Sequence, residues 1–196
     1  MNAAEKPFFR RMPQLQRYVE NFKTYFIQSN CYAFANWKSY SQMEVLHFEE
    51  NESSASQFSN LISILPEKFI RKISVFRIRS GIQLYPHKDY RNFALNFPLV
   101  GDFNNTPTTW YSANSPEEKT LYDDSAERAI KFNSPLDCTP IAAVSGFSPL
   151  LINTTILHGV DNSKSKVDRF TLSISGSDNI SFLEAADLLN PLLSGV

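Results

Sequence analysis

The feature that most constrains the fold is a series of short segments with strand character between residues 73 and 175. The clearest is Ile73-Ser74-Val75-Phe76-Arg77-Ile78-Arg79, rich in β-branched and aromatic residues and ended by Ser80-Gly81. Sixteen Phe and eight Tyr against only six Gly also favour a β-rich interior. Short strands separated by turn signals predict a small β-barrel or sandwich. We expect strands at 43–48, 73–79, 83–89, 93–100, 108–111, 141–144, 150–153, 156–160 and 170–175.

Segments of helical period flank these strands. From 13 to 28, apolar residues such as Leu15, Val19 and Phe22 recur at steps of three and four, which predicts an amphipathic helix. A second helix is expected over 54–65, stopped before a proline, and a third over 182–193. We therefore expect one domain over the 196 residues. Its parts would be a helical support region (1–70), a β-barrel core (71–178) with a polar surface insertion at about 102–140, and a C-terminal helix (179–196).

Charge and composition exclude some classes of partner. The formal net charge is −1, so no chain-wide field attracts nucleic acid or an anionic membrane, and a nucleic-acid substrate is the least attractive. No apolar run approaches the roughly 18 residues of a membrane span, and the N-terminus lacks the apolar core of a secretory signal. Cys31 and Cys138 form no metal-ligand spacing, so we expect free thiols in a reducing, cytoplasmic environment.

Two of the three histidines fit a metal site. In Pro86-His87-Lys88-Asp89 the imidazole and the carboxylate are two residues apart, and residues i and i+2 of a strand point to the same face. His47-Phe48-Glu49 has the same spacing. We prefer His87, because Leu46 and Phe48 would form the core face of their strand and leave His47 on the solvent face.

His158 supplies a second imidazole at the end of a strand and precedes Gly159, which lets another group approach closely. Arg169 opens the last strand and shares one face with Thr171 and Ser173. A guanidinium beside a hydroxyl suits a terminal carboxylate. Taken alone, Arg169 would be an ordinary surface ion pair with a neighbouring aspartate. Together with two imidazoles and a carboxylate, the combination that non-haem Fe(II) oxygenases use, a functional role is favoured.

The order His-x-Asp, distal His, Arg-x-Thr resembles the Fe(II)- and 2-oxoglutarate-dependent oxygenases. The framing segments Leu95-Asn96-Phe97-Pro98-Leu99 and Leu151-Ile152-Asn153-Thr154 are also similar to that family. The resemblance covers roughly Ile73 to Ser175, about half of the chain. It implies a mainly β fold with flanking helices, namely a double-stranded β-helix (jelly-roll, cupin-like) barrel.

The resemblance also implies residue roles. His87, Asp89 and His158 would bind Fe(II), while Arg169 and Thr171 would hold the C5 carboxylate of 2-oxoglutarate. The expected enzyme is a dioxygenase that consumes O2, hydroxylates an unactivated C–H bond and releases succinate and CO2, with ascorbate in a supporting role. Asp89 favours hydroxylation, since halogenases of the family have a small residue at that position. The substrate would be a small molecule, or an amino-acid or peptidyl side chain.

Five further residues are candidates for the pocket, and three of them have two interpretations. Asn96 would hydrogen-bond the C1 carboxylate of 2-oxoglutarate or be satisfied by backbone, and Tyr85 would border the 2-oxoglutarate pocket. Arg91 would contact a carboxylate of the substrate or cosubstrate, or lie on the surface. Arg77 would line the pocket mouth, and Trp110 would be a substrate platform or a core aromatic.

Two other classes of function stay open. One is a cupin-like, metal-dependent binding protein or isomerase without redox chemistry, although such sites usually have more histidines than this chain provides unless His47 joins them. The other is a noncatalytic barrel that serves as an interaction module, against which the intact triad argues.

Overall fold

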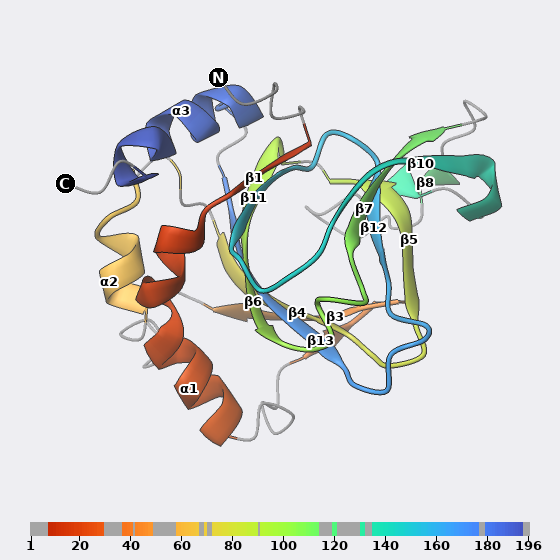
Figure 1. The fold of residues 1–196 in the computed structure, drawn as a ribbon, viewed down its shortest axis with the longest axis horizontal. Coiled ribbons are helices and arrows are strands. Elements are labelled where there is room, and N and C mark those ends of the chain that lie inside the picture. The colour runs from red at the N-terminus through yellow and green to blue at the C-terminus, as the bar shows by residue number, and fades with distance from the viewer. Residues whose placement is uncertain are drawn as a thin grey trace.

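The computed structural model describes residues 8–29, 37–40, 42–48, 58–66, 69, 72–89, 91–113, 119–120, 130–131, 135–176 and 179–193. Two antiparallel sheets enclose an interior, as in a jelly roll, and helices lie to one side of them (Figure 1). This confirms the expectation of a mainly β fold with flanking helices. Among the described residues no helix is long and apolar enough to cross a membrane.

The larger sheet has the strand order β1-β11-β6-β13-β4-β3-β2, and the smaller sheet has the order β10-β7-β12-β5-β9-β8. Strands far apart in sequence are therefore neighbours in both sheets, as the crossing connections of a jelly roll require. The strands of the larger sheet are β1 (Phe9–Arg11), β2 (Lys38–Ser39), β3 (Glu44–Phe48), β4 (Lys72–Ile78), β6 (Phe93–Val100), β11 (Leu150–Asn153) and β13 (Arg169–Ser175). Those of the smaller sheet are β5 (Gln83–Lys88), β7 (Thr108–Ala113), β8 (Lys119–Thr120), β9 (Ile130–Lys131), β10 (Cys138–Val144) and β12 (His158–Asp161).

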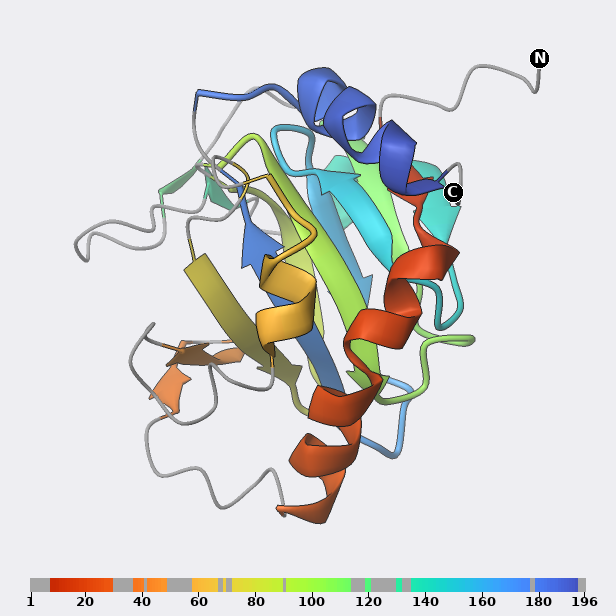
Figure 2. The same cartoon turned by 90° about the vertical axis from the view of Figure 1, so that its left-hand side faces the viewer.

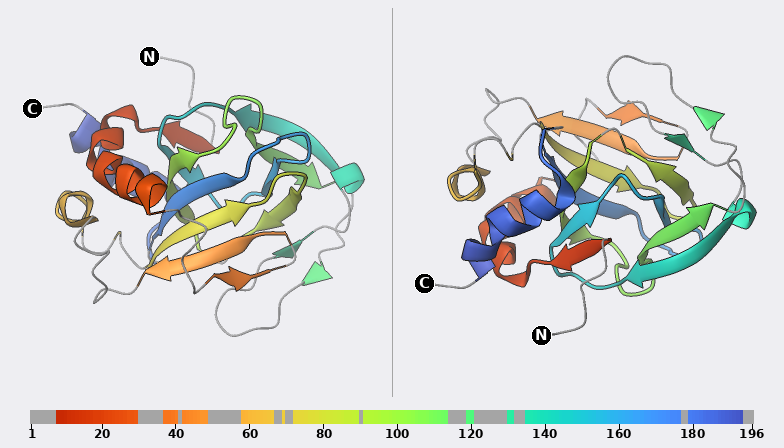
Figure 3. Two further views of the ribbon diagram at one scale, coloured as in Figure 1. Left: turned by 90° about the horizontal axis from the view of Figure 1, so that it is seen from below. Right: turned by 90° about the horizontal axis from the view of Figure 1, so that it is seen from above.

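The helices cover the outer face of the larger sheet (Figure 2), and the views from below and above show them on the same side of the strands (Figure 3). The helix expected over 13–28 is divided into a 3-10 helix, Pro13–Tyr18, and α1, Glu20–Gln28, because the Val19 N–H bonds three residues back to Gln16. The helix expected over 54–65 contains the single turn α2 (Ser59–Ile62), and residues 54–57 lie outside the described part. A second 3-10 turn spans Pro135–Asp137. The C-terminal helix α3 (Phe182–Leu193) is confirmed.

Alternation along each strand of the larger sheet separates a helix-facing side from an interior side. On β13, Phe170, Leu172 and Ile174 are fully buried in the core beneath the helices, where they meet Phe22 and Phe26 of α1. Each such burial contributes about 1.5–3 kcal/mol relative to exposure. The intervening residues of β13 point the other way, into the space between the sheets.

Part of the segment expected as a polar surface insertion over 102–140 belongs to the barrel. Residues 102–107 turn back against the barrel, with Phe103 and Thr106 buried, and 108–113 form β7. Two apolar anchors inside a polar stretch explain the difference, because Phe103 and Trp110 bring this segment inward. Cys138, at the start of β10, is a buried free thiol, whereas Cys31 lies outside the described residues.

Candidate active site

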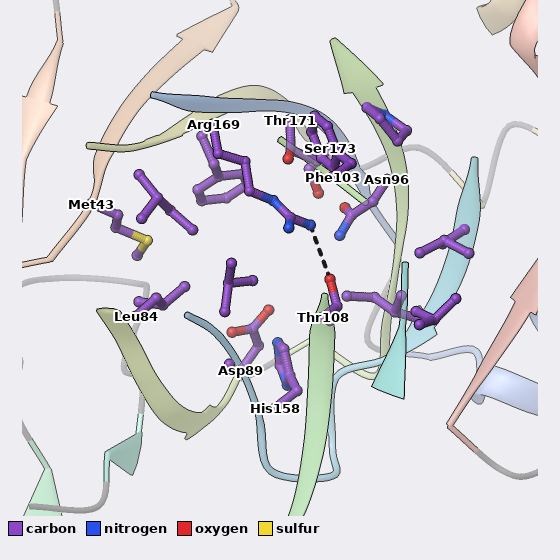
Figure 4. Close-up of a pocket in the computed structure, with 18 of the residues that line it drawn as sticks. Met43, Leu84, Asp89, Asn96, Phe103, Thr108, His158, Arg169, Thr171 and Ser173 are labelled. Carbon is purple, nitrogen blue, oxygen red and sulfur yellow. Dashed lines mark hydrogen bonds between the residues drawn. The ribbon is translucent and has the colours of Figure 1, made fainter. Parts of the chain in front are cut away.

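A cavity of about 350 Å³ lies between the two sheets. Figure 4 shows Arg169, Thr171, Ser173 and Asn96 reaching into it from one side, and Asp89 and His158 from the facing side. The remaining lining is largely apolar, with side chains such as Met43, Leu84, Val144, Leu150 and Ile152. A mostly apolar cavity with a few convergent polar groups is the usual form of a small-molecule site.

A bulge in β5 brings His87 to the interior. His158 of β12 pairs with His87, but Val160, two residues on, pairs with Leu84, three residues back along β5. The extra residue reverses the pleat, so that Leu84 and His87 both face the cavity although they are an odd number of residues apart. A Cβ at Gly159 would lie 2.6 Å from the carbonyl oxygen of Leu84. The group that approaches Gly159 closely, as expected from the sequence, is therefore the backbone of β5.

The three expected metal ligands come together. Potential ligand atoms of His87, Asp89 and His158 all lie within 4.8 Å of one another, and they form the one such group found among the described residues. His87 Nδ1 donates to the Tyr85 carbonyl at 2.9 Å, and His158 Nδ1 donates to the Ile156 carbonyl at 2.9 Å, since a carbonyl can only accept. Each ring therefore keeps its Nε2 lone pair for a metal ion.

The electrostatics of this group suit a divalent cation. Burial, followed by the neighbouring His87, lowers the pKa of His158 to about 4, so this imidazole is uncharged at neutral pH. Burial acts to raise the pKa of Asp89, but the positive charge of the Arg91 guanidinium outweighs it and holds this pKa well below its usual range. Arg91 Nε donates to Asp89 Oδ2 at 2.7 Å. Two imidazoles and one carboxylate fit the donor set of a non-haem Fe(II) site.

Arg169 lies in the same cavity as a buried cation, with 6% of its surface exposed. Its Nη1 donates to the carbonyl and to Oγ1 of Thr106, its Nη2 donates to Thr108 Oγ1 at 3.1 Å, and its Cζ lies 4.2 Å from the Phe103 ring centroid. Burial lowers the pKa of Arg169 to about 9, which leaves the guanidinium charged at neutral pH. No carboxylate of a described residue forms an ion pair with it. A buried charge without a counter-ion is costly unless a ligand supplies one.

The alternative interpretation of Arg169, a surface ion pair with a neighbouring aspartate, is wrong. Asp168 instead accepts from Arg77 at 2.6 Å, and Asp161 accepts from the backbone N–H of Ser163 at 2.9 Å. Both aspartates thus have other partners, and neither forms an ion pair with the buried guanidinium. Arg169 therefore remains available to bind the carboxylate of a ligand.

Thr171, Ser173 and Asn96 extend the polar surface beside Arg169. Ser173 and Asn96 are cross-strand neighbours on β13 and β6. Asn96 Oδ1 and Ser173 Oγ are buried and have no hydrogen-bond partner, which costs roughly 1–3 kcal/mol per atom if nothing binds there. The backbone does not satisfy this oxygen of Asn96, so the side chain has hydrogen-bonding capacity left for a ligand or a bound water.

Arg77 and Tyr85 do not line the cavity. Arg77 alternates with the cavity-lining Phe76 and Ile78 of β4, so it faces the helix side, where it pairs with Glu44 at 2.9 Å. Its expected place at the pocket mouth is therefore wrong, for reasons of strand parity. Tyr85 lies within the β5 bulge and is absent from the described lining residues, because the bulge gives the interior position to its neighbours.

Trp110 is a core aromatic rather than a substrate platform. It is fully buried, stacks on Phe9 with ring centroids 5.2 Å apart, and donates its indole N–H to the Asn153 carbonyl at 3.3 Å. It is also the cross-strand neighbour of His158 on β7. Trp110 therefore supports the strand that carries a metal ligand.

His47 lies away from the metal-ligand group. Its Nδ1 is 2.8 Å from Ser74 Oγ. Cross-strand pairing with Ser74 places His47 on the interior side of the larger sheet rather than on the expected solvent side, while Leu46 and Phe48 pack toward the core as predicted. Glu49 lies outside the described residues. The structure thus separates the two His-x-acid patterns by position in the barrel.

The sequence did not predict the groups that hold Arg169. Phe103 and Thr106 belong to the segment expected at the surface, whose polar residues Asp102, Asn104 and Asn105 resemble an ordinary turn. Thr108 opens the strand expected over 108–111, but its contact with Arg169 was not foreseen. The one signal available was Phe103 itself, a large apolar residue within that turn.

Comparison with family models gives no match for this sequence, and comparison with curated protein sequences gives none either. Solved structures share the fold. The epimerase SnoN, in complex with Fe3+, alpha ketoglutarate and nogalamycin RO, has a TM-score of 0.57 at 10% identity, over 88% of this chain and 80% of that one. HygX from Streptomyces hygroscopicus, with nickel, 2-oxoglutarate and hygromycin B bound, has a TM-score of 0.51 at 12% identity, over 90% and 86%.

A vicilin from Corylus avellana is also similar, with a TM-score of 0.39 at 10% identity over 72% of this chain. The chain spans 30% of the vicilin's length. At these identities, the likeness to SnoN and HygX shows the jelly-roll fold, which confirms the fold expected from the sequence.

Proposed function

We propose that this protein is an Fe(II)- and 2-oxoglutarate-dependent dioxygenase. The observation that carries the proposal is the buried, charged Arg169 in the same cavity as the His87, Asp89 and His158 group. A metal site alone would suit many cupins. The Arg169 guanidinium can bind one carboxylate of a ligand, and the His87, Asp89 and His158 group can hold a metal that the other end of the ligand chelates. This combination suits a dicarboxylate such as 2-oxoglutarate.

The residues present fit the iron, and His87, Asp89 and His158 would hold it through the two Nε2 atoms and a carboxylate oxygen. Bound Fe(II) would supply coordination of the 2-oxo acid and activation of O2. Arg169 and Thr171 would bind the C5 carboxylate, and Asn96 would hydrogen-bond near the C1 carboxylate. The overall reaction converts 2-oxoglutarate, O2 and R–H into succinate, CO2 and R–OH.

Hydroxylation of a small molecule, or of an amino-acid or peptidyl side chain, is the outcome we propose. SnoN and HygX are both described with 2-oxoglutarate bound, and SnoN is an epimerase, so a barrel of this shape with this cosubstrate is not restricted to hydroxylation. The carboxylate of Asp89 occupies the third ligand position here. Its presence supports hydroxylation rather than halogenation.

The test is succinate formation by purified protein supplied with Fe(II), ascorbate, O2 and 2-oxoglutarate, followed by mass spectrometry. We expect slow turnover even without a substrate. His87→Ala and Asp89→Ala should abolish it, because each removes a metal ligand. His47→Ala is the matched control and should keep it, since His47 lies outside the ligand group. Succinate formation that survives loss of His87 would contradict the metal assignment.

Arg169→Ala separates the cosubstrate from the metal. It should weaken 2-oxoglutarate binding by about tenfold or more, because it removes a charge-assisted contact, while Mn(II) binding persists. Metal binding without any 2-oxoglutarate binding by the wild-type protein would instead support a non-redox cupin.

A further inference from the structure

The cavity extends well beyond the space that 2-oxoglutarate would need. Along β13, the interior residues run from Arg169 through Thr171 and Ser173 to Ser175, and all four line the cavity. Six strand steps of about 3.3 Å separate the two ends by about 20 Å. A five-carbon cosubstrate held at Arg169 covers only part of that length. The part near Ser175 therefore remains for a substrate.

The charged side chains that line the cavity are mostly basic. Lys72 is the cross-strand neighbour of Ser175 and lines the cavity, and Arg91 lines it next to the metal-ligand group. The described lining residues include three cations, Lys72, Arg91 and Arg169, against the single carboxylate of Asp89. Fe(II) and the 2-oxoglutarate dianion cancel each other in charge. Leaving Lys72 aside, Arg91 and Arg169 against Asp89 leave the loaded cavity with a net charge of one positive from these three side chains.

Arg91 is placed to use this charge on a ligand. Its Nε donates to Asp89 Oδ2 at 2.7 Å, and its Cζ lies 5.4 Å from the ring centroid of Phe76, another lining residue. These two contacts fix the plane of the guanidinium. Its Nη groups make no hydrogen bond to a described residue. A fixed guanidinium with unused N–H donors matches the geometry of a carboxylate.

We propose, resting on the proposed function, that the substrate is a small organic acid whose carboxylate binds the Nη groups of Arg91. Because Arg91 donates a hydrogen bond to Asp89, one of the proposed metal ligands, the bound carboxylate is held close to the metal. The carbon that is hydroxylated is then one near this carboxylate. The apolar walls formed by Leu150 and Ile152 accommodate the rest of the molecule.

The test uses Mn(II)-loaded protein saturated with 2-oxoglutarate, so that the Arg169 site is already filled and no turnover occurs. The probes are matched pairs of small organic acids and their uncharged amides, for example 3-phenylpropanoate and 3-phenylpropanamide, and calorimetry measures their binding. We expect acids to bind about tenfold or more tightly than their amides. Arg91→Gln should remove this preference, and Arg91→Lys should keep part of it. Lys164→Gln, which removes an exposed lysine away from the cavity lining, is the control and should retain it.

Amides that bind as tightly as acids, an acid preference that survives Arg91→Gln, or a panel in which no acid binds would each overturn the proposal. The initial 2-oxoglutarate titration keeps the two ideas apart. If 2-oxoglutarate itself does not bind, the proposed function fails. If it binds and the acids show no preference, only the substrate inference fails.

Discussion

Gly159→Ala tests the strand geometry on which the metal site depends. The added Cβ would lie 2.6 Å from the carbonyl oxygen of Leu84 and 3.2 Å from the backbone nitrogen of Pro86. The first distance is 0.4 Å shorter than 3.0 Å, below which Cβ atoms essentially never approach another heavy atom. Both neighbours are backbone atoms of the β5 bulge. The strain can be relieved only by moving β5 away from β12, because no flexible side chain is available to give way.

The expected cost follows from this contact. Overpacking of a closely packed region typically costs about 1–3 kcal/mol, a sizeable share of a domain's stability of about 5–15 kcal/mol. The strands that separate carry His87 and His158, which are cross-strand neighbours. A shift of a few tenths of an ångström between two ligands should also weaken metal binding, by about tenfold.

Urea denaturation and Mn(II) titration measure the two effects. Gly81→Ala is the matched control, because Gly81 has a φ of +78° but a Cβ added there would meet nothing within 4 Å, so it tests backbone strain without a clash. We expect Gly81→Ala to lose about 1 kcal/mol of stability and to keep its metal affinity. If Gly159→Ala has wild-type stability and wild-type Mn(II) affinity, the bulge does not approach Gly159 as described and the reasoning is refuted.

Two further predictions concern the cosubstrate site and the unloaded metal site. Thr106→Val removes a hydroxyl that accepts from Arg169 Nη1 and donates to the Asp102 carbonyl. The dissociation constant of 2-oxoglutarate should therefore rise about fivefold, and Thr106→Ser should restore it. An unchanged dissociation constant would show that Thr106 does not position the guanidinium. In metal-free protein, the pKa of His158 is about 4 in the folded state and 6.5 in the unfolded state, so between these values the unfolded state binds more protons. The contribution of neutral His158 to the free energy of unfolding is therefore fully present above pH 6.5 and is lost as the pH drops toward 4. Urea denaturation should show a loss of about 2 kcal/mol between pH 7 and pH 5 that His158→Gln abolishes, and an equal loss in that variant would assign the effect to another group.

The order of chemical groups along the chain was enough to predict the candidate site. His87 and Asp89 at a strand end, His158 at another, and Arg169 with Thr171 on the last strand all line the same cavity. This worked because strand parity is local, and the i, i+2 rule applies without knowledge of the partner strand. The same rule could not tell which of the two faces was the interior one, and for that reason Arg77 was placed on the wrong side.

Bulges and inward-turning loops are beyond a parity argument. The extra residue at Tyr85–Pro86 reverses the pleat of β5, and nothing in the alternation of that segment signals it. Residues 102–107 have the composition of a surface turn, yet Thr106 and Phe103 enclose the Arg169 guanidinium. Such features depend on contacts between segments distant in sequence, which no single window of residues contains.

The sequence by itself therefore determined the mainly β barrel, its helical flank and the identity of the chemical groups, since periodicity and residue type are local properties. Only the tertiary structure decided where the two histidines of equivalent local pattern lie, because His47 and His87 belong to different sheets and both face the interior. It also decided that Arg169 is buried without a carboxylate partner among the described residues and that Arg91 presents unused donors beside the metal-ligand group. Burial and pairing are properties of the packed barrel. They leave the guanidinium groups of Arg169 and Arg91 in a position to bind an anionic ligand.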